Sequence, residues 1–181
     1  MAAKIWFTSD THFGHVNIIE YCRRPFPDVD AMDAEMIRRW NDVVAKDDTV
    51  YHLGDFAMGD KKRWAAYLAA LNGRKLICVG NHDLDAASMV ESVGFDDAFD
   101  DRIIEVEGRR IWLNHFPIEN PEESRGFERP KAPGEFDVAL CGHVHNRWIE
   151  RAGCINVGVD VWDFIPVGLD ELPFTGPGRG T

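Results

Sequence analysis

The acidic, amide and imidazole side chains of this chain gather in short motifs that directly follow predicted strands. The motifs are Asp10-Thr11-His12, Gly54-Asp55, Gly80-Asn81-His82-Asp83, Asn114-His115 and Gly142-His143-Val144-His145. Ligands of α/β sheets bind outside the carboxyl ends of the strands, so these side chains converge if their strands are neighbours. Asp, His and Asn together suit divalent manganese, iron, zinc or nickel. The sequence therefore predicts a metal site at one edge of a sheet.

The spacing within the motifs fits this interpretation. Residues two apart in an extended chain point the same way, so both side chains of Asp10-x-His12 and of His143-x-His145 can face one site. A glycine precedes Asp55, Asn81 and His143, and glycine lets the backbone turn sharply where a strand ends.

Short apolar runs alternate with helical patterns and supply the strands that these motifs need. The patterns predict strands at 5–8, 49–53, 75–79 and 137–141, helices at 30–44, 61–71 and 86–93, a hairpin of 103–106 with 111–114, and short strands at 155–157 and 167–169. The βαβαβ start implies parallel strands joined by right-handed crossovers.

Composition sets the broad class of the protein. The chain has 181 residues, 45% of them apolar, and a net charge of −11. We expect one domain over residues 1–170 and a flexible tail over 171–181. The acidic balance argues against an extensive nucleic-acid surface. No apolar run is long enough to span a membrane, no signal peptide is recognisable, and the four cysteines form no CxxC pair, so we expect a cytoplasmic protein.

Taken together and in this order, the five motifs resemble the full motif set of the calcineurin-like metallophosphoesterases. The resemblance covers about residues 4–160. It implies an α/β (α+β) fold, a four-layer αββα sandwich of two mixed β-sheets flanked by helices.

The resemblance also implies a role for each motif residue. Asp55 bridges two divalent metal ions, manganese first, with iron, zinc, nickel or cobalt as alternatives. A hydroxide between the metals attacks phosphorus directly, and His82 donates a proton to the leaving oxygen or stabilises phosphoryl charge. The implied ligands of one metal are Asp10, His12 and His145, and those of the other are Asn81, His115 and His143.

One position departs from the family pattern. Many members carry Gly-Asp-x-x-Asp, in which the second Asp orients the catalytic histidine, but Met58 stands at that place here. Asp60 or Asp83 could take over this task. Asp83 is therefore a candidate catalytic residue beside His82, or alternatively the cap of the helix that follows.

Several residues near the motifs have candidate roles of lower specificity. His15 and Arg147 are candidates for substrate contact, His15 alternatively for a hydrogen bond to a ligand carboxylate. His52 is expected to make a hydrogen bond in the core or behind a ligand. The segments 23–26 and 125–131 are candidate phosphate-binding patches or solvated surface charge, and 117–133 reads as a long loop.

The function that follows is metal-dependent hydrolysis of a phosphate ester. We expect a phosphodiesterase that acts on small diesters, such as cyclic nucleotides or aryl and nucleotide diesters, an expectation that rests on analogy with small members of the family. The alternatives are a phosphomonoesterase, a nuclease, and a metal-binding scaffold without catalysis. We expect a monomer or a homodimer and no membrane partner.

Overall fold

Two five-stranded mixed sheets form the centre of the molecule in this computed structural model, which describes residues 3–118 and 131–174. The first sheet has the order β10-β1-β2-β3-β4 and the second β5-β6-β7-β9-β8. The strands of the first sheet are β1 (Ile5–Thr8), β2 (Thr49–His52), β3 (Arg74–Cys78), β4 (Asp97–Phe99) and β10 (Val167–Gly168). Those of the second are β5 (Asp101–Val106), β6 (Arg109–Asn114), β7 (Val138–Cys141), β8 (Glu150–Arg151) and β9 (Cys154–Asn156).

The helices of the described residues are mostly short. They are α1 (Ile18–Cys22), α2 (Val29–Val43), α3 (Lys61–Ala70), α4 (Ala86–Ser88), a π-helix (Met89–Val93) and two 3₁₀ helices (Val159–Val161 and Leu169–Glu171). Asp28 and Asp60 cap α2 and α3, since their carboxylates accept from Ala31 N and Arg63 N. The Asp60 carboxylate therefore serves as the N-cap of α3. No contact in the described residues supports the expectation that Asp60 orients His82.

Successive side chains along the strands of the first sheet point to opposite faces, and each face contributes to a separate hydrophobic core. Trp6, Val50 and Ile77 face the helices, whereas Phe7 and Cys78 face the second sheet. The core between the sheets is completed from the second sheet by Ile111, Leu113, Leu140 and Ile155.

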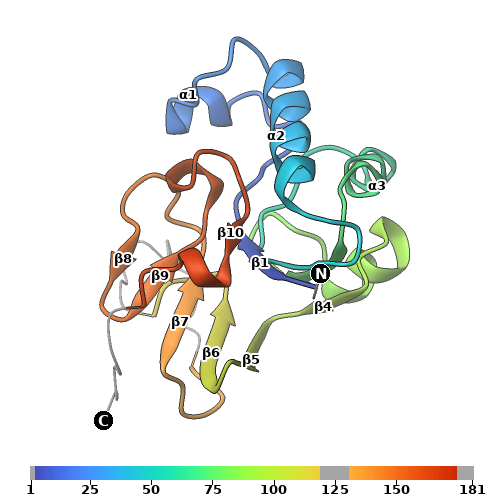
Figure 1. Ribbon diagram of the computed structural model, residues 1–181. Coiled ribbons are helices and arrows are strands. Elements are labelled where there is room, and N and C mark those ends of the chain that lie inside the picture. The colour runs from blue at the N-terminus through green and yellow to red at the C-terminus, as the bar shows by residue number, and fades with distance from the viewer. Residues whose placement is uncertain (1–2, 119–130, 175–181) are drawn as a thin grey trace.

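The helices α2 and α3 pack on the first sheet, and Figure 1 shows both on the side of β1 and β4, away from β6 and β7. Trp112, Ala139, Cys141 and Cys154 form a small cluster on the outer face of the second sheet. Phe136 and other non-helical residues cover that cluster in the described part of the chain. The expected α/β class with two mixed sheets is confirmed.

The predicted elements recur with small shifts, and the structure adds others. The strands β1, β2 and β3 are mutually parallel, as the βαβαβ pattern predicts. The hairpin is longer than expected, since β5 and β6 pair from Asp101–Asn114 to Val106–Arg109. The sequence did not predict α1, β4 or β8, and the helix expected at 86–93 is half π-helical.

The chain remains packed beyond the domain boundary expected at residue 170. Leu172 is buried in the core between the sheets, and Phe174 packs against that core and under the Arg109 guanidinium. The rest of the expected tail, and most of the 117–133 loop and the 125–131 patch, lie outside the described residues. Within the described ranges, no helix has the length and hydrophobicity needed to cross a bilayer.

Candidate metal centre

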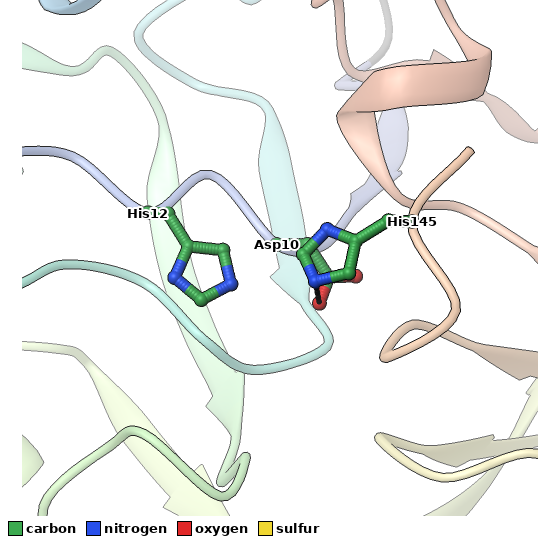
Figure 2. Close-up of side chains that lie close together, drawn as sticks. All are labelled: Asp10, His12 and His145. Atoms are coloured by element: carbon green, nitrogen blue, oxygen red, sulfur yellow. Dashed lines mark ion pairs between the residues drawn. The ribbon is translucent and has the colours of Figure 1, made fainter. Parts of the chain in front are cut away.

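The ends of β1 and β7 bring together one group of possible metal ligands. Asp10 and His12 lie just beyond β1, and His145 follows β7 (Figure 2). One possible ligand atom from each of these residues lies within 4.8 Å of the others. His145 Nε2 is 4.0 Å from Asp10 Oδ1. The structure thus brings together the three residues that we expect to bind one metal.

A second group of possible metal ligands lies beside the first. Asp55 follows β2, and its carboxylate lies with His115 and His143 within the same 4.8 Å limit. Asp55 Oδ2 is 3.5 Å from His12 Nε2 and 3.6 Å from His115 Nε2. One carboxylate therefore reaches both groups, as the bridging role requires. Asn81 adjoins the second group, with Oδ1 3.1 Å from His115 Nε2.

The hydrogen bonds of these histidines fit a metal at their Nε2 atoms. His12 Nε2 is buried and has no hydrogen-bond partner. His115 Nδ1 lies 2.7 Å from the Leu53 carbonyl, which only accepts, so Nδ1 donates this hydrogen bond and Nε2 is directed toward Asp55 and Asn81. A buried, unpartnered imidazole nitrogen beside carboxylates is the feature that a bound cation would satisfy.

The backbone at these strand ends is unusual. Ten non-glycine residues of the described chain have positive φ, and five of them are expected metal ligands. Their φ values lie between 49° and 68°, and the residues are Asp10, His12, Asp55, His143 and His145. Such conformations cost about 1–3 kcal/mol each and cluster at functional sites.

Two glycines permit the strand ends to approach one another. A Cβ on Gly80 would lie 2.4 Å from Asp55 Oδ1. A Cβ on Gly142 would lie 1.9 Å from Ser9 Oγ and 2.6 Å from Asp10 Oδ2. The absence of a side chain at these positions is a condition for the site's geometry.

Burial and neighbouring charges set the ionisation of the two groups. Burial lowers the pKa of His12, which favours the neutral imidazole that binds metals. Burial raises the pKa of Asp55, but the charge of His115 and the contact with His12 outweigh it and keep the pKa low. For His145, burial lowers the pKa, yet Asp10 and Asp160 raise it to about 11, so a metal at this ring would replace a proton.

Asp83 binds backbone rather than the His82 ring. Its Oδ2 accepts from Asp55 N at 2.7 Å and Gly80 N at 2.8 Å, and its Oδ1 accepts from Phe56 N at 2.9 Å. Asp83 thus ties together the loops after β2 and β3. It does not cap α4, because Asp85 does so. Through these contacts, Asp83 positions Asp55.

An open pocket of about 340 Å³ lies over the two groups. His82 is exposed on its wall, and its backbone N donates to Asp55 Oδ1 at 2.9 Å. Its ring meets that of His12 edge-on at 5.4 Å. This location gives the His82 imidazole access to a ligand in the pocket.

His15 and Arg147, the candidate substrate-binding residues, also line the pocket. His15 Nδ1 lies 3.4 Å from His12 Nδ1, so its neighbour is an imidazole and not a ligand carboxylate. Burial and the nearby histidines lower the pKa of His15 to about 4, which leaves it neutral at pH 7.

His52 makes the hydrogen bonds expected of a core residue behind the site. Its Nδ1 accepts from Gly54 N at 3.2 Å. Thr11 Oγ1 donates to the Phe56 carbonyl and therefore accepts from His52 Nε2 at 2.9 Å. The neutral ring thus links the loops after β1 and β2.

The sequence did not predict the roles of three residues whose side chains are buried behind the site. Arg24 belongs to the 23–26 segment, but it is buried and bound to Asp160, so it is not a surface residue that binds phosphate. Asn156 Nδ2 donates to the carbonyls of His145 and Trp148 and fixes the loop after β7. In the sequence, Asp160 is an acidic residue between two apolar residues, Val159 and Val161, and this pattern could have indicated a buried carboxylate.

Comparisons with known proteins match nearly the whole chain. A family model described as the calcineurin-like phosphoesterase superfamily domain matches residues 3–163. An uncharacterized protein of Methanocaldococcus jannaschii is 36% identical over 179 residues, covering 93% of this chain and 89% of its own. The gene 66 protein of Mycobacterium phage L5 is 33% identical over 196 residues, covering 94% and 92%. A solved structure of a protein of unknown function from Aquifex aeolicus is similar with a TM-score of 0.74 and 32% identity, covering 94% and 97%.

Proposed function

Because the chain belongs to the calcineurin-like phosphoesterase superfamily, we propose that it is a dinuclear metal-dependent phosphodiesterase that hydrolyses small phosphodiesters. The observation that carries the proposal is the pair of ligand groups that meet at Asp55, each built from histidine and aspartate. The open pocket over these groups supports access for a small substrate.

The proposed ligands are those expected from the sequence. Asp10, His12 and His145 hold one cation, and Asn81, His115 and His143 hold the other, with Asp55 between them. Two divalent cations here, manganese or one of its alternatives, would supply Lewis acidity that activates water for in-line attack on phosphorus. The His82 imidazole donates a proton to the leaving oxygen. Asp83 keeps Asp55 in place through the backbone N–H groups of Asp55 and Phe56.

The pocket wall has few cationic side chains beside the proposed metal ligands. A diester carries one negative charge at pH 7, whereas a monoester, with a second pKa near 6, carries up to two. Among the described lining residues, Arg147 is the one arginine or lysine, and His15 is neutral. Beyond the proposed metal ions, the wall thus offers one guanidinium for phosphoryl charge, which is sufficient for the single charge of a diester.

The first experiment compares a diester with a monoester. Metal-stripped protein is refilled in turn with manganese, nickel, zinc and iron, and hydrolysis of bis-p-nitrophenyl phosphate and p-nitrophenyl phosphate is followed. We expect metal-dependent turnover that is faster with the diester. Faster monoester turnover would support a phosphomonoesterase, and bound metal without any turnover would support a scaffold.

Two variants separate the proton donor from the metal ligands. His82→Ala should retain both metals and lose about 10²- to 10⁴-fold in kcat with poor leaving groups such as alkyl esters, and less with p-nitrophenyl esters. Asp55→Asn should lower both metal content and activity. Metal analysis beside the kinetics checks both variants, and loss of metal from His82→Ala would make His82 a ligand instead.

A further inference from the structure

A buried ion pair lies directly behind the pocket. Arg24 Nε donates to Asp160 Oδ1 at 2.8 Å, and Nη2 donates to Oδ2 at 3.0 Å. The exposed fractions of the two side chains are 0% and 2%. Two parallel charge-assisted hydrogen bonds fix the plane of the carboxylate, because the guanidinium fork has a rigid geometry.

Arg24 also holds the loop that carries two of the proposed ligands. Nη2 donates to the Asp10 carbonyl at 2.7 Å, and Nη1 donates to the Thr11 carbonyl at 2.9 Å. The same guanidinium thus binds the backbone after β1 and the 3₁₀ helix that contains Asp160. Arg24 and Asp160 themselves lie 136 residues apart in sequence.

Asp160 in turn contacts a proposed metal ligand. Its Oδ2 lies 3.2 Å from His145 Nδ1. An ionised carboxylate only accepts hydrogen bonds, so His145 Nδ1 is the donor. The other ring nitrogen, Nε2, faces Asp10 (Figure 2). Asp160 therefore selects the form of His145 whose Nε2 can bind a cation together with Asp10 and His12.

A second interpretation of the same atoms is a separate metal site. Cys22, His145 and Asp160 also bring three possible ligand atoms within 4.8 Å of one another. Arg24 argues against it, because its guanidinium already occupies both carboxylate oxygens of Asp160 and would repel a cation there.

We propose that Asp160, held by Arg24, is a positioning residue that sets the orientation and tautomer of His145 for metal binding. The inference rests on the proposed function only in that His145 binds a metal. It assigns a role to two residues that belong to none of the five motifs. Loss of such a partner behind a metal-binding histidine typically costs 10- to 100-fold in metal affinity.

The test measures metal binding and the state of the His145 ring, without activity. Asp160→Asn keeps the side-chain size and removes the charge. Asp163→Asn is the matched control, since Asp163 lies on the same segment with its side chain 80% exposed. Calorimetric titration of the metal-free proteins with Mn²⁺ should show one of two sites weakened about 10- to 100-fold in Asp160→Asn and no change in Asp163→Asn.

Histidine ¹⁵N NMR of the Zn²⁺-loaded proteins gives the second measurement. Wild type and Asp163→Asn should show His145 with a protonated, exchange-protected Nδ1, and Asp160→Asn should lose this protection.

The variant Arg24→Lys keeps the positive charge but loses the forked geometry of the guanidinium, so we expect a smaller loss of Mn²⁺ affinity than in Asp160→Asn. In the double variant, Arg24→Lys should add to Asp160→Asn only the loss of its bonds to the Asp10 and Thr11 carbonyls, because its effect on His145 acts through Asp160. If Asp160→Asn does not fold, Arg24→Lys alone carries the test, and wild-type affinity with an unchanged Nδ1 signal would overturn the inference.

The outcomes distinguish this inference from the proposed function. Unchanged Mn²⁺ affinity in folded Asp160→Asn would overturn it. So would the loss of a complete third equivalent of metal, which would make Cys22, His145 and Asp160 a site of their own. Tight Mn²⁺ binding that depends on Asp160, in a protein that hydrolyses neither ester, would leave the inference standing and remove the proposed phosphodiesterase.

Discussion

At the scale of single residues, His52 illustrates how the site depends on groups that never reach the pocket. The ring accepts from Gly54 N at one nitrogen and donates to Thr11 at the other. Protonation would turn the accepting nitrogen into a donor facing an N–H group. Burial of the whole side chain opposes the charged form as well and lowers the pKa of His52 to about 3.

This pKa predicts a pH dependence of stability. Unfolded His52 titrates near 6.5, so between pH 6.5 and about 3 the unfolded state binds the proton that the folded state refuses. The stabilisation is complete above pH 6.5 and declines as the pH falls. Between pH 7.5 and pH 5 the contribution of His52 should fall by about 2 kcal/mol.

Urea unfolding in the presence of a chelator measures this effect. His52→Gln is the comparison, because glutamine is neutral at both pH values. Wild type should lose about 2 kcal/mol more than His52→Gln on going from pH 7.5 to pH 5. Equal losses of unfolding free energy in the two proteins would contradict a neutral, buried His52.

The residues of the site could be predicted from the sequence to different degrees. Polar residues at strand ends are visible in the sequence, and the structure brings those of the five motifs together. Arg24 and Asp160 were not predicted, because their pairing joins a turn after α1 to a 3₁₀ helix at the far end of the chain. The backbone contacts of Asp83 were equally hidden, since they depend on how closely the loops after β2 and β3 approach.

At the scale of the elements, the site consists of strand ends that come into close contact. Gly142 is the clearest case, because a methyl group there would overlap Ser9 Oγ, and Ser9 precedes Asp10. The space between β1 and β7 is therefore set by the missing side chain of one residue.

Gly142→Ala should consequently weaken both folding and metal binding. The strand ends must separate to relieve the overlap, at a cost of about 1–3 kcal/mol in the free energy of unfolding. The displaced Asp10 should also lower Mn²⁺ affinity. Thermal melts and calorimetric titration check both effects. The control is Gly134→Ala, where the nearest atom would lie 3.6 Å from the added methyl group and neither quantity should change.

The sequence predicts the strands whose apolar runs are long enough to be recognised. The strands β1 and β3 have buried apolar side chains on both faces, and β2 has Val50 buried on one face and Tyr51 partly buried on the other, so apolar side chains mark all three strands. By contrast, β4 is Asp-Ala-Phe, and β8 is the exposed pair Glu150–Arg151. Both are strands only because β3 and β9 lie beside them, which is tertiary information that a local pattern does not carry.

At the scale of the whole molecule, each proposed metal group draws ligands from both sheets. Asp10 and His12 follow a strand of the first sheet and His145 one of the second. Asp55 follows a strand of the first sheet, and His115 and His143 follow strands of the second. A bound cation would therefore link the sheets across their common core.

Metal removal should accordingly destabilise the entire fold. A ligand that binds only the folded state adds about 2.7 kcal/mol per site at a free concentration of 100 Kd. For a chain of this size we expect Mn²⁺ to raise the Tm of chelator-treated protein by roughly 5–10 °C per site. Differential scanning calorimetry checks this shift, and His145→Ala should show a smaller one. A Tm independent of Mn²⁺ would contradict a site shared between the sheets.

The division of ligands between the sheets also has a consequence for biosynthesis. Chains emerge from the ribosome N-terminus first, at about 5–20 residues per second. Asp10, His12 and Asp55 are translated early, yet neither group can assemble before His143 and His145 have been added. A nascent chain thus holds only part of each group until these residues are added. Metal binding at the complete groups would therefore follow translation of the second sheet, and a metal-loaded molecule would be one whose two sheets have already docked.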